Sequence, residues 1–266
     1  MSVFVVGGTG HTGLHVVERV RALGFDARAA TRKPLRKGEV RFDWSDPATH
    51  DVSGSTAMYL IAPPFDPNPA RTMIAMIRRA RDQGVQRFAL LSSSAIAEGT
   101  PGLGEVEQFL RVEGLGVTLK PSWFMQNFTD REHFHGRTIH VEKRLYSSTG
   151  RGRIGFVDAA DIGDVAAHVL TMSSPPSEPL VLTGPETLSY ADVAALLGAT
   201  YVPIDDEAAR QRLIDSGMGP SYAEFLVELD ARIRDRAEDR VTDTVERITG
   251  RPPHRFADVV ARTSTT

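Results

Sequence analysis

The sequence predicts an α/β fold in which a doubly wound parallel sheet carries a smaller C-terminal lobe. Three observations support this prediction. Short apolar runs typical of buried parallel strands alternate with segments of helical periodicity through the first half of the 266 residues. The first apolar run ends in a cluster of glycines that leads directly into a helical pattern. Beyond about residue 128 the alternation stops, and the chain becomes mostly helical and charged.

The opening strand, expected at residues 3–6, is followed by a turn with the pattern Gly7-x-x-Gly10-x-x-Gly13. Apolar residues then recur at helical spacing over 14–23. Glycines in such a turn allow positive φ and close approach of a ligand, and the N-terminus of the helix offers free N–H groups to a phosphate. The turn therefore predicts an NAD(P)-binding Rossmann fold, with a tight turn that binds nothing as the alternative.

The remaining strands of the sheet are expected over 26–30, 39–42, 57–62, 86–91 and 117–119, with helices over 70–84 and 106–112. In a doubly wound sheet the ligand lies at the carboxyl ends of the strands. Thr12, just before the expected helix, could contact the cofactor or cap the helix, and the two interpretations are equally good. We expect cofactor contacts from the residues at these ends, namely Gly7, Thr9, Gly10, His11, Thr12, Gly13, Arg32, Lys33, Asp43, Trp44, Ile61, Ala62, Pro63, Ser92, Ser93 and Lys120.

The end of the second expected strand carries two cations in place of an acid. Proteins that bind NAD usually have an aspartate or glutamate there, which accepts hydrogen bonds from the ribose hydroxyls. This chain has Arg32 and Lys33 directly after Thr31, and an arginine side chain matches the geometry of a 2′-phosphate. The pattern favours NADP(H) over NAD(H) as cofactor, with a solvated basic turn as the alternative.

The second half of the chain predicts a smaller mixed α/β lobe. A helix is expected after Asp158, a short strand over 180–182 and a further helix after Ser189. Residues 207–249 are mostly helical, with an apolar series at near-helical spacing that we interpret as core: Tyr222, Phe225, Leu229 and Ile233. We therefore expect a Rossmann core over 1–153 and a substrate-capping lobe over 154–266, packed on it as one continuous unit.

Composition limits the partners of this chain. Hydrophobic residues make up 41% and charged residues 24% of the sequence, and the formal net charge is −3, so we expect no nucleic-acid partner. No apolar run approaches the roughly 18 residues of a spanning helix, and the first residues do not resemble a signal peptide, so we expect no membrane partner. The absence of cysteine excludes disulfides and thiolate chemistry and fits a cytoplasmic location. We expect a monomer or homodimer that acts on a small-molecule substrate.

Other catalytic motifs are weak or missing. His133 and His135 lie two residues apart without a clear third ligand, so we expect a solvated loop and no metal site. The sequence contains neither the Gly-x-Ser-x-Gly of hydrolases nor the Gly-Lys-Ser/Thr of a P-loop. Hydrolysis and phosphoryl transfer therefore have no support.

The chain resembles the NmrA-like branch of the atypical short-chain dehydrogenases, and within it the fungal ergot-alkaloid reductases known as festuclavine and agroclavine dehydrogenases. The similar stretches are Val5-Val-Gly-Gly-Thr-Gly-His-Thr-Gly13, Phe42-Asp-Trp44, Ala62-Pro-Pro64, Trp123-Phe-Met-Gln-Asn127, Ser148-Thr-Gly-Arg-Gly152, Phe156-Val-Asp158 with Asp161-Ile162, Gly184-Pro-Glu186 and Thr249-Gly250. The resemblance implies that NADP or NAD binds in the glycine turn and that Trp123, Phe124 and Asn127 lie beside the nicotinamide. The family usually has arginine at the position of Lys120, which is a departure.

Ordinary short-chain dehydrogenases protonate their substrate with a Tyr-x-x-x-Lys pair, in which the lysine lowers the pKa of the tyrosine. No tyrosine of this chain has a lysine four residues later, whether at 59, 146, 190, 201 or 222. Hydride transfer to an iminium needs no proton, and a quinone or activated alkene can take its proton from solvent. We therefore expect reduction of one of these acceptors, and the resemblance implies the iminium. The alternative is a non-catalytic NADP(H)-sensing regulator.

We assign no catalytic residue. The expected substrate pocket contains three aromatic side chains that could stack on a planar acceptor, and core packing is an equally good interpretation of each. Ser93 and Ser94, at the end of the fifth strand, could also donate a hydrogen bond to the substrate, although contact with the nicotinamide or the backbone is the preferred interpretation. The expected pocket residues are Ser94, Trp123, Phe124, Asn127 and Phe156.

Overall fold

The computed structural model describes residues 1–64, 66 and 68–263, and the chain forms two compact units. The first unit comprises Met1–Pro121, Ala159–Leu182 and Thr244–Arg251. The second comprises Ser122–Asp158, Thr183–Asp243 and Pro252–Thr266. The units are interleaved along the chain, whereas the sequence predicts a single boundary between residues 153 and 154. The difference arises because a strand and two helices from the second half of the chain pack on the sheet of the first unit.

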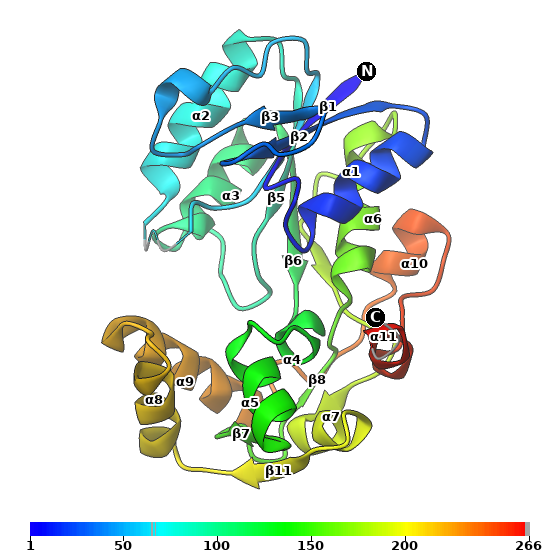
Figure 1. Cartoon of the computed structure of the whole chain (residues 1–266). Coiled ribbons are helices and arrows are strands. Elements are labelled where there is room, and N and C mark those ends of the chain that lie inside the picture. Colours follow the sequence, from blue (N-terminus) through cyan, green and yellow to red (C-terminus); the bar gives the residue numbers. More distant parts are fainter. Residues whose placement is uncertain (65, 67, 264–266) are drawn as a thin grey trace. The chain divides into compact units, whose positions relative to one another are not determined.

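A seven-stranded sheet forms the centre of the first unit, and all of its strand pairs are parallel (Figure 1). The sheet confirms the predicted doubly wound fold, because β1 lies in the middle with β2 on one side and β4 on the other. The strand over 180–182, expected in the C-terminal lobe, instead extends this sheet beside β6. In spatial order the strands are β3 (Glu39–Arg41), β2 (Asp26–Thr31), β1 (Ser2–Val6), β4 (Ala57–Leu60), β5 (Arg87–Leu91), β6 (Gly116–Pro121) and β9 (Leu180–Leu182).

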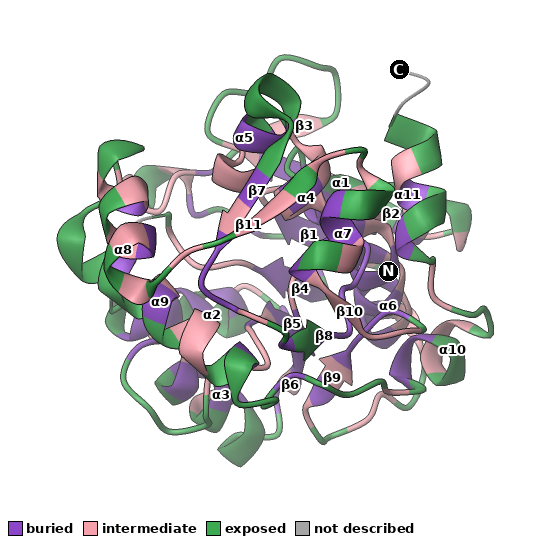
Figure 2. Cartoon of the chain, turned by 90° about the horizontal axis from the view of Figure 1, so that it is seen from below, coloured by how far each residue is buried: buried purple, intermediate pink, exposed green. Residues whose placement is uncertain are grey.

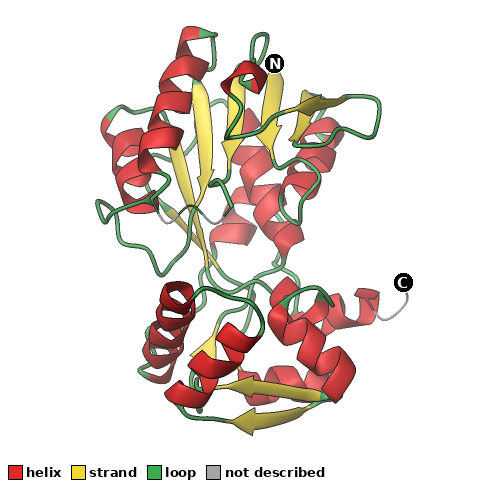
Figure 3. Cartoon of the chain, turned by 60° about the vertical axis from the view of Figure 1, so that its left-hand side comes forward, coloured by secondary structure: helices red, strands yellow, loops and turns green. Residues whose placement is uncertain are grey.

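Helices cover both faces of this sheet (Figure 3). Strand β4 is buried along its whole length, which explains its continuous apolar sequence. On one face α1 packs closely on α6, where a Cβ on Gly163 would lie only 2.5 Å from the Cβ of His15. Apolar side chains of α2 and α3 join the main core cluster of the sheet. The helices of this unit are α1 (Gly13–Ala22), the short 3-10 helix η1 (Pro47–Thr49), α2 (Ala70–Asp82), α3 (Leu103–Val112), α6 (Ala159–Thr171) and α10 (Thr244–Thr249).

The second unit has two small sheets and a separate aromatic core. Strands β7 (Arg144–Ser147) and β11 (Thr200–Pro203) are parallel, and β8 (Arg153–Ile154) and β10 (Leu188–Ser189) are antiparallel. Its core contains aromatic rings packed mainly edge to face, among them Phe128, Phe156, Tyr190 and Phe256. The helices are α4 (Gln126–Thr129), α5 (Phe134–Glu142), α7 (Tyr190–Leu196), α8 (Asp206–Asp215), α9 (Pro220–Arg234) and α11 (Phe256–Thr263).

Helix α9 corrects one expectation about the core. Tyr222 and Phe225 are 56% and 42% exposed, whereas Ala223 and Val227 are buried. Exposed and buried residues both occur along α9 (Figure 2). The apolar series therefore marks the core only in part. Ile233 lies in the aromatic core as expected, whereas Tyr222 and Phe225 lie off the face of α9 that packs on α8. Across the described part of the chain, no helix has the length and apolar character needed to cross a membrane.

Candidate functional site

The glycine turn between β1 and α1 is tight enough to exclude side chains. Gly7 has a φ of 67°, and a Cβ on Gly8 would lie 2.7 Å from the Cα of Ala29 in the neighbouring strand. A Cβ on Gly13 would lie 2.2 Å from the carbonyl oxygen of Gly7. The Gly10 N–H donates to that same oxygen at 2.8 Å. The turn thus brings the N-terminus of α1 directly over the end of β1, where its N–H groups can bind a phosphate.

Thr12 does not cap α1. Its hydroxyl accepts a hydrogen bond of 2.9 Å from the phenol of Tyr59, which comes from β4 and is fully buried. Burial raises the pKa of Tyr59 above its usual value, although the hydrogen bond with Thr12 opposes the rise. The phenol therefore remains a donor at neutral pH and connects β4 to the glycine turn. The sequence contained no signal for this contact.

Two exposed cations follow β2 at the edge of the sheet. Arg32 and Lys33 are both exposed. Hydrogen bonds from Ser45 hold the pKa of Asp43 below its usual value, and the positive charge of Arg32 contributes to the same effect. Trp44 is half-buried and packs edge to face on Phe42, with ring centroids 5.1 Å apart. Arg32 and Asp43 thus follow two neighbouring strands, β2 and β3, at the same edge of the sheet.

The end of β4 lies beside the glycine turn. A Cβ on Gly7 would lie 2.3 Å from the Cδ1 of Ile61, so this side chain borders the turn. Ala62 and Pro63 follow it and are half-buried. Thr9 borders the turn on the β2 side, where its hydroxyl donates to that of Thr31 at 3.3 Å. The ends of β2 and β4 thus flank the glycine turn at the N-terminus of α1, an arrangement that suits a dinucleotide.

Two of the expected cofactor contacts bind a buried glutamate instead. The hydroxyl of Ser92 donates to the carboxylate of Glu107, and the ammonium of Lys120 donates to the same carboxylate at 2.8 Å. Glu107 is 1% exposed and lies on the inner face of α3. Lys120 also donates to the carbonyl of Ile96. Sequence reasoning missed this network, although a glutamate between the buried apolar positions of an amphipathic helix was a usable signal.

Neighbouring serines have local partners. The hydroxyl of Ser93 accepts a hydrogen bond of 3.2 Å from the N–H of Ala95. The backbone N–H of Ser94 donates to the carbonyl of Pro121 at 2.9 Å. Both residues are half-buried and belong to the first unit.

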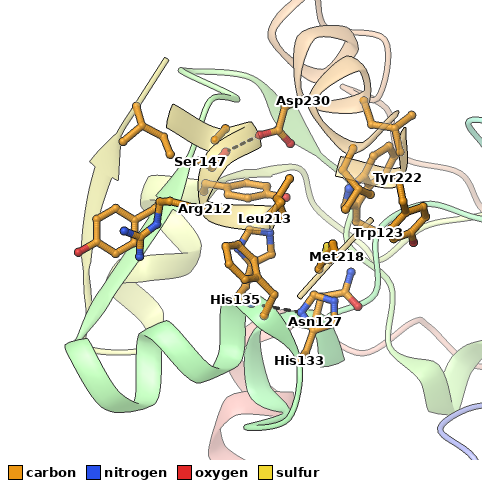
Figure 4. A pocket seen from close by; sticks show the side chains of 17 residues that line it. Trp123, Asn127, His133, His135, Ser147, Arg212, Leu213, Met218, Tyr222 and Asp230 are labelled. Carbon is orange, nitrogen blue, oxygen red and sulfur yellow. Dashed lines mark hydrogen bonds between the residues drawn. The ribbon is translucent and has the colours of Figure 1, made fainter. Parts of the chain in front are cut away.

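A cavity of about 250 Å³ lies within the second unit (Figure 4). Trp123 and Asn127, two of the expected pocket residues, line it. Phe124 and Phe156 are not among its lining residues. Phe156 is 1% exposed and packs in the aromatic core, which supports the alternative interpretation of this residue. Sequence reasoning missed several lining side chains that come from distant segments, including His135, Tyr146, Tyr190, Arg212, Tyr222 and Asp230.

His135 enters the cavity wall as a neutral imidazole. Its ring stacks on Phe128, with centroids 5.3 Å apart and planes at 7°, and lies perpendicular to Tyr190. Burial, with a smaller contribution from the nearby His133, lowers the pKa of His135 to about 3. The Nδ1 of His133 accepts a hydrogen bond of 3.3 Å from the backbone N–H of His135 and thereby caps α5. The two histidines thus have structural roles at the start of a helix, and the expected solvated loop is wrong.

The low pKa of His135 predicts acid sensitivity of the fold. In the unfolded chain its pKa is near 6.5, so between that value and about 3 the unfolded state binds one more proton than the folded state. The free energy of unfolding should therefore fall with decreasing pH across this window, by up to about 1.4 kcal/mol per pH unit from this group. His135→Gln should reduce the slope measured by urea unfolding between pH 6 and about 4.5. His140→Gln, at an exposed position of the same helix, is the matched control for the substitution. Equal slopes in all three proteins would contradict this assignment.

Comparisons with known proteins identify full-length relatives. No family model matches the chain. The oxidoreductase YesF of Bacillus subtilis (strain 168) is 34% identical over an alignment that covers 97% of this chain and 94% of the relative. Agroclavine dehydrogenase of Claviceps fusiformis is 32% identical, with 98% of this chain and 96% of the relative covered. Among solved structures, the triphenylmethane reductase of Citrobacter sp. in complex with NADP(H) has a TM-score of 0.81 at 17% identity and covers 99% of this chain and 100% of that one.

Proposed function

Because the chain belongs to the NmrA-like branch of the atypical short-chain dehydrogenases, an oxidoreductase family with an NAD(P)-binding Rossmann fold, we propose that it is an NAD(P)H-dependent reductase of a small organic acceptor. The observation that carries the proposal is the glycine turn, in which the carbonyl of Gly7 leaves no room for a side chain on Gly13. A turn this compact at the N-terminus of α1 suits a pyrophosphate. The proposed acceptor is an iminium, a quinone or an activated alkene.

Arg32 and Lys33 support a preference for NADP(H) over NAD(H). Both cations are exposed at the end of β2, and no carboxylate stands at that strand end to accept hydrogen bonds from a ribose. The nearby carboxylate of Asp43 is held by the N–H and hydroxyl of Ser45. The Arg32 guanidinium therefore remains available to form a bidentate ion pair with a 2′-phosphate.

The choice of acceptors follows from the missing proton donor. A reduced nicotinamide supplies a hydride, that is, two electrons and one proton. Hydride addition to the carbon of an iminium gives a neutral amine and needs nothing further. A quinone or activated alkene becomes an anion that solvent can protonate. The cavity of the second unit suits any of these acceptors, because its aromatic side chains can hold a planar molecule and exclude water from it.

The first test is a titration of the purified protein with NADPH and with NADH, in which nicotinamide fluorescence reports binding. The second is a spectrophotometric assay of NADPH oxidation with a panel of iminium, quinone and activated-alkene acceptors. Tight binding of NADPH together with steady oxidation of NADPH by one acceptor class is the expected result. Tight binding without turnover across the panel would contradict the reductase and favour a nucleotide-sensing regulator. That regulator would bind a protein partner with an affinity that depends on NADP(H).

Arg32→Glu should weaken NADPH binding about 10- to 100-fold, because a charge-assisted contact to the 2′-phosphate is replaced by repulsion. NADH lacks that phosphate, so its affinity should change by no more than about threefold. The dissociation constants are measured by the same fluorescence titration. Lys37→Glu makes the same charge change in the same exposed loop and serves as the control. An equal loss for NADPH and NADH in Arg32→Glu would exclude the phosphate contact.

A further inference from the structure

Asp230 places a carboxylate in the wall of the second-unit cavity, at the C-terminal part of α9 (Figure 4). One of its oxygens, Oδ2, accepts three hydrogen bonds: from the N–H and the hydroxyl of Ser148, both at 3.1 Å, and from the hydroxyl of Ser147 at 3.2 Å. Within the described residues, the other oxygen, Oδ1, accepts no hydrogen bond. The side chain is thus held firmly through one oxygen, and the second remains able to bind a ligand.

The positive charges near Asp230 are paired with other groups. Arg234 forms a two-pronged ion pair with Asp206, at 2.6 and 2.9 Å. The guanidinium of Arg212, which also lines the cavity, lies 3.6 Å from the centroid of the Tyr146 ring and 3.6 Å from a carboxylate oxygen of Glu142. Among the described residues no cationic side chain forms an ion pair with Asp230.

Burial raises the pKa of Asp230 above its usual value, although the hydrogen bonds from Ser148 and Ser147 and the positive charge of Arg234 oppose this rise. Such a rise is expected of a partly buried carboxylate that has donors but no ion-paired partner. Arg234 pairs directly with Asp206, so a ligand with a positive charge would give Asp230 a direct ion-pair partner and would stabilise the ionised form of the carboxylate.

The rest of the cavity wall favours an aromatic ligand with a positive charge. Trp123, Tyr190 and Tyr222 line the cavity together with Asp230, and the faces of such rings attract cations. His135, which is neutral above its low pKa, adds no repelling charge. The volume of about 250 Å³ lies just below the range of pockets for drug-sized ligands, which starts at roughly 300 Å³. A molecule with a single ring or two fused rings is small enough for this cavity.

We propose that the cavity selects a small planar aromatic cation, and that Asp230 is the specificity-determining residue that binds its charge. The inference rests on the proposed function in one respect, since it narrows the acceptor of the reductase to the positively charged, iminium-type class. Binding of the cation to the second unit needs no nucleotide, so it can be measured separately from hydride transfer.

The experiment compares two probes of nearly equal size in the absence of nucleotide. N-methylquinolinium carries a permanent positive charge, and 4-methylquinoline is neutral at pH 8. The chain has two tryptophans, so a Trp44→Phe background leaves Trp123, in the cavity wall, as the only tryptophan reporter. Quenching of Trp123 gives the dissociation constants, and isothermal titration calorimetry checks them.

The parent protein should bind the cation at least about 10-fold more tightly than the neutral probe. Asp230→Asn keeps the shape and an oxygen that can accept from Ser148, and it should weaken binding of the cation roughly 10- to 100-fold while leaving the neutral probe unchanged. Glu228→Gln removes one negative charge from an exposed position of the same helix and should change neither constant by more than about twofold. Circular dichroism and thermal unfolding establish that each variant is folded.

The inference would be overturned if the parent bound both probes with equal affinity, or if the parent and Asp230→Asn bound the cation with equal affinity. Failure of both probes to bind would also overturn it. These outcomes are separate from a failure of the proposed function. Turnover of a neutral quinone without any preference for the cation would retain the reductase and remove the role of Asp230. Preference for the cation without turnover of any acceptor would retain the role of Asp230 and remove the reductase.

Discussion

Gly13→Ala is expected to reduce the affinity for NADPH about 100-fold or more. The added Cβ would lie 2.2 Å from the carbonyl oxygen of Gly7 and 3.0 Å from the Cα of Gly8, and both of these are backbone atoms that cannot move aside alone. The N-terminus of α1 must therefore shift away from the end of β1. Loss of two charge-assisted hydrogen bonds to a phosphate, at about 1.5 kcal/mol each, accounts for this factor. Nicotinamide fluorescence measures the affinity.

The same substitution should lower the free energy of unfolding by about 1–3 kcal/mol, the usual cost of overpacking. Gly219→Ala is the matched control, because a Cβ on Gly219 meets no atom within 4 Å and its φ of −65° suits alanine. If Gly13→Ala bound NADPH as well as Gly219→Ala does, the glycine turn would not be the nucleotide site.

Glu107→Ala should lower the free energy of unfolding by about 3–5 kcal/mol, because it leaves the ammonium of Lys120 buried without its carboxylate. The hydroxyl of Ser92 would lose its acceptor in the same variant. Urea unfolding, followed by the fluorescence of Trp44 in a Trp123→Phe background, measures the effect in the first unit.

Two further variants separate the buried ion pair from general damage to α3. Glu98→Ala removes a more exposed carboxylate, which pairs with Arg111 of α3. This variant should lower the free energy of unfolding by no more than about 1 kcal/mol. The double variant Glu107→Leu with Lys120→Met should recover most of the free energy of unfolding that Glu107→Ala loses, because no unpaired charge remains buried. A loss below about 1 kcal/mol in Glu107→Ala would show that the pair is not buried in solution.

These two predictions concern different kinds of residue in the first unit. Gly13 acts through the space that its missing side chain leaves, whereas Glu107 acts through the charge that it balances. The first effect should therefore appear mainly in the affinity for nucleotide and the second mainly in stability. The ion pair with Glu107 gives Lys120 a structural role, whereas its position at the end of β6 suggested a cofactor contact.

Local patterns in the sequence were sufficient to predict the sheet of the first unit. The apolar runs of β1, β4, β5 and β6 are buried in the structure, and the glycine spacing placed the turn between β1 and α1. Such patterns work because the periodicity of a segment reports how its own two faces are buried. The strand over 180–182 was predicted, but its place beside β6 was not, because three residues carry no information about which sheet edge they join.

For the site, the sequence by itself determined which residue types stand at the strand ends: glycines at the turn after β1, Arg32 and Lys33 after β2, and Trp123 and Asn127 after β6. Only the tertiary structure decided which polar groups meet. Tyr59 reaches Thr12 over 47 residues of sequence, and Asp230 reaches Ser148 over 82. Periodicity describes single elements, whereas these contacts depend on how distant elements pack, and the free energy of a buried polar group depends on the partner that packing brings to it.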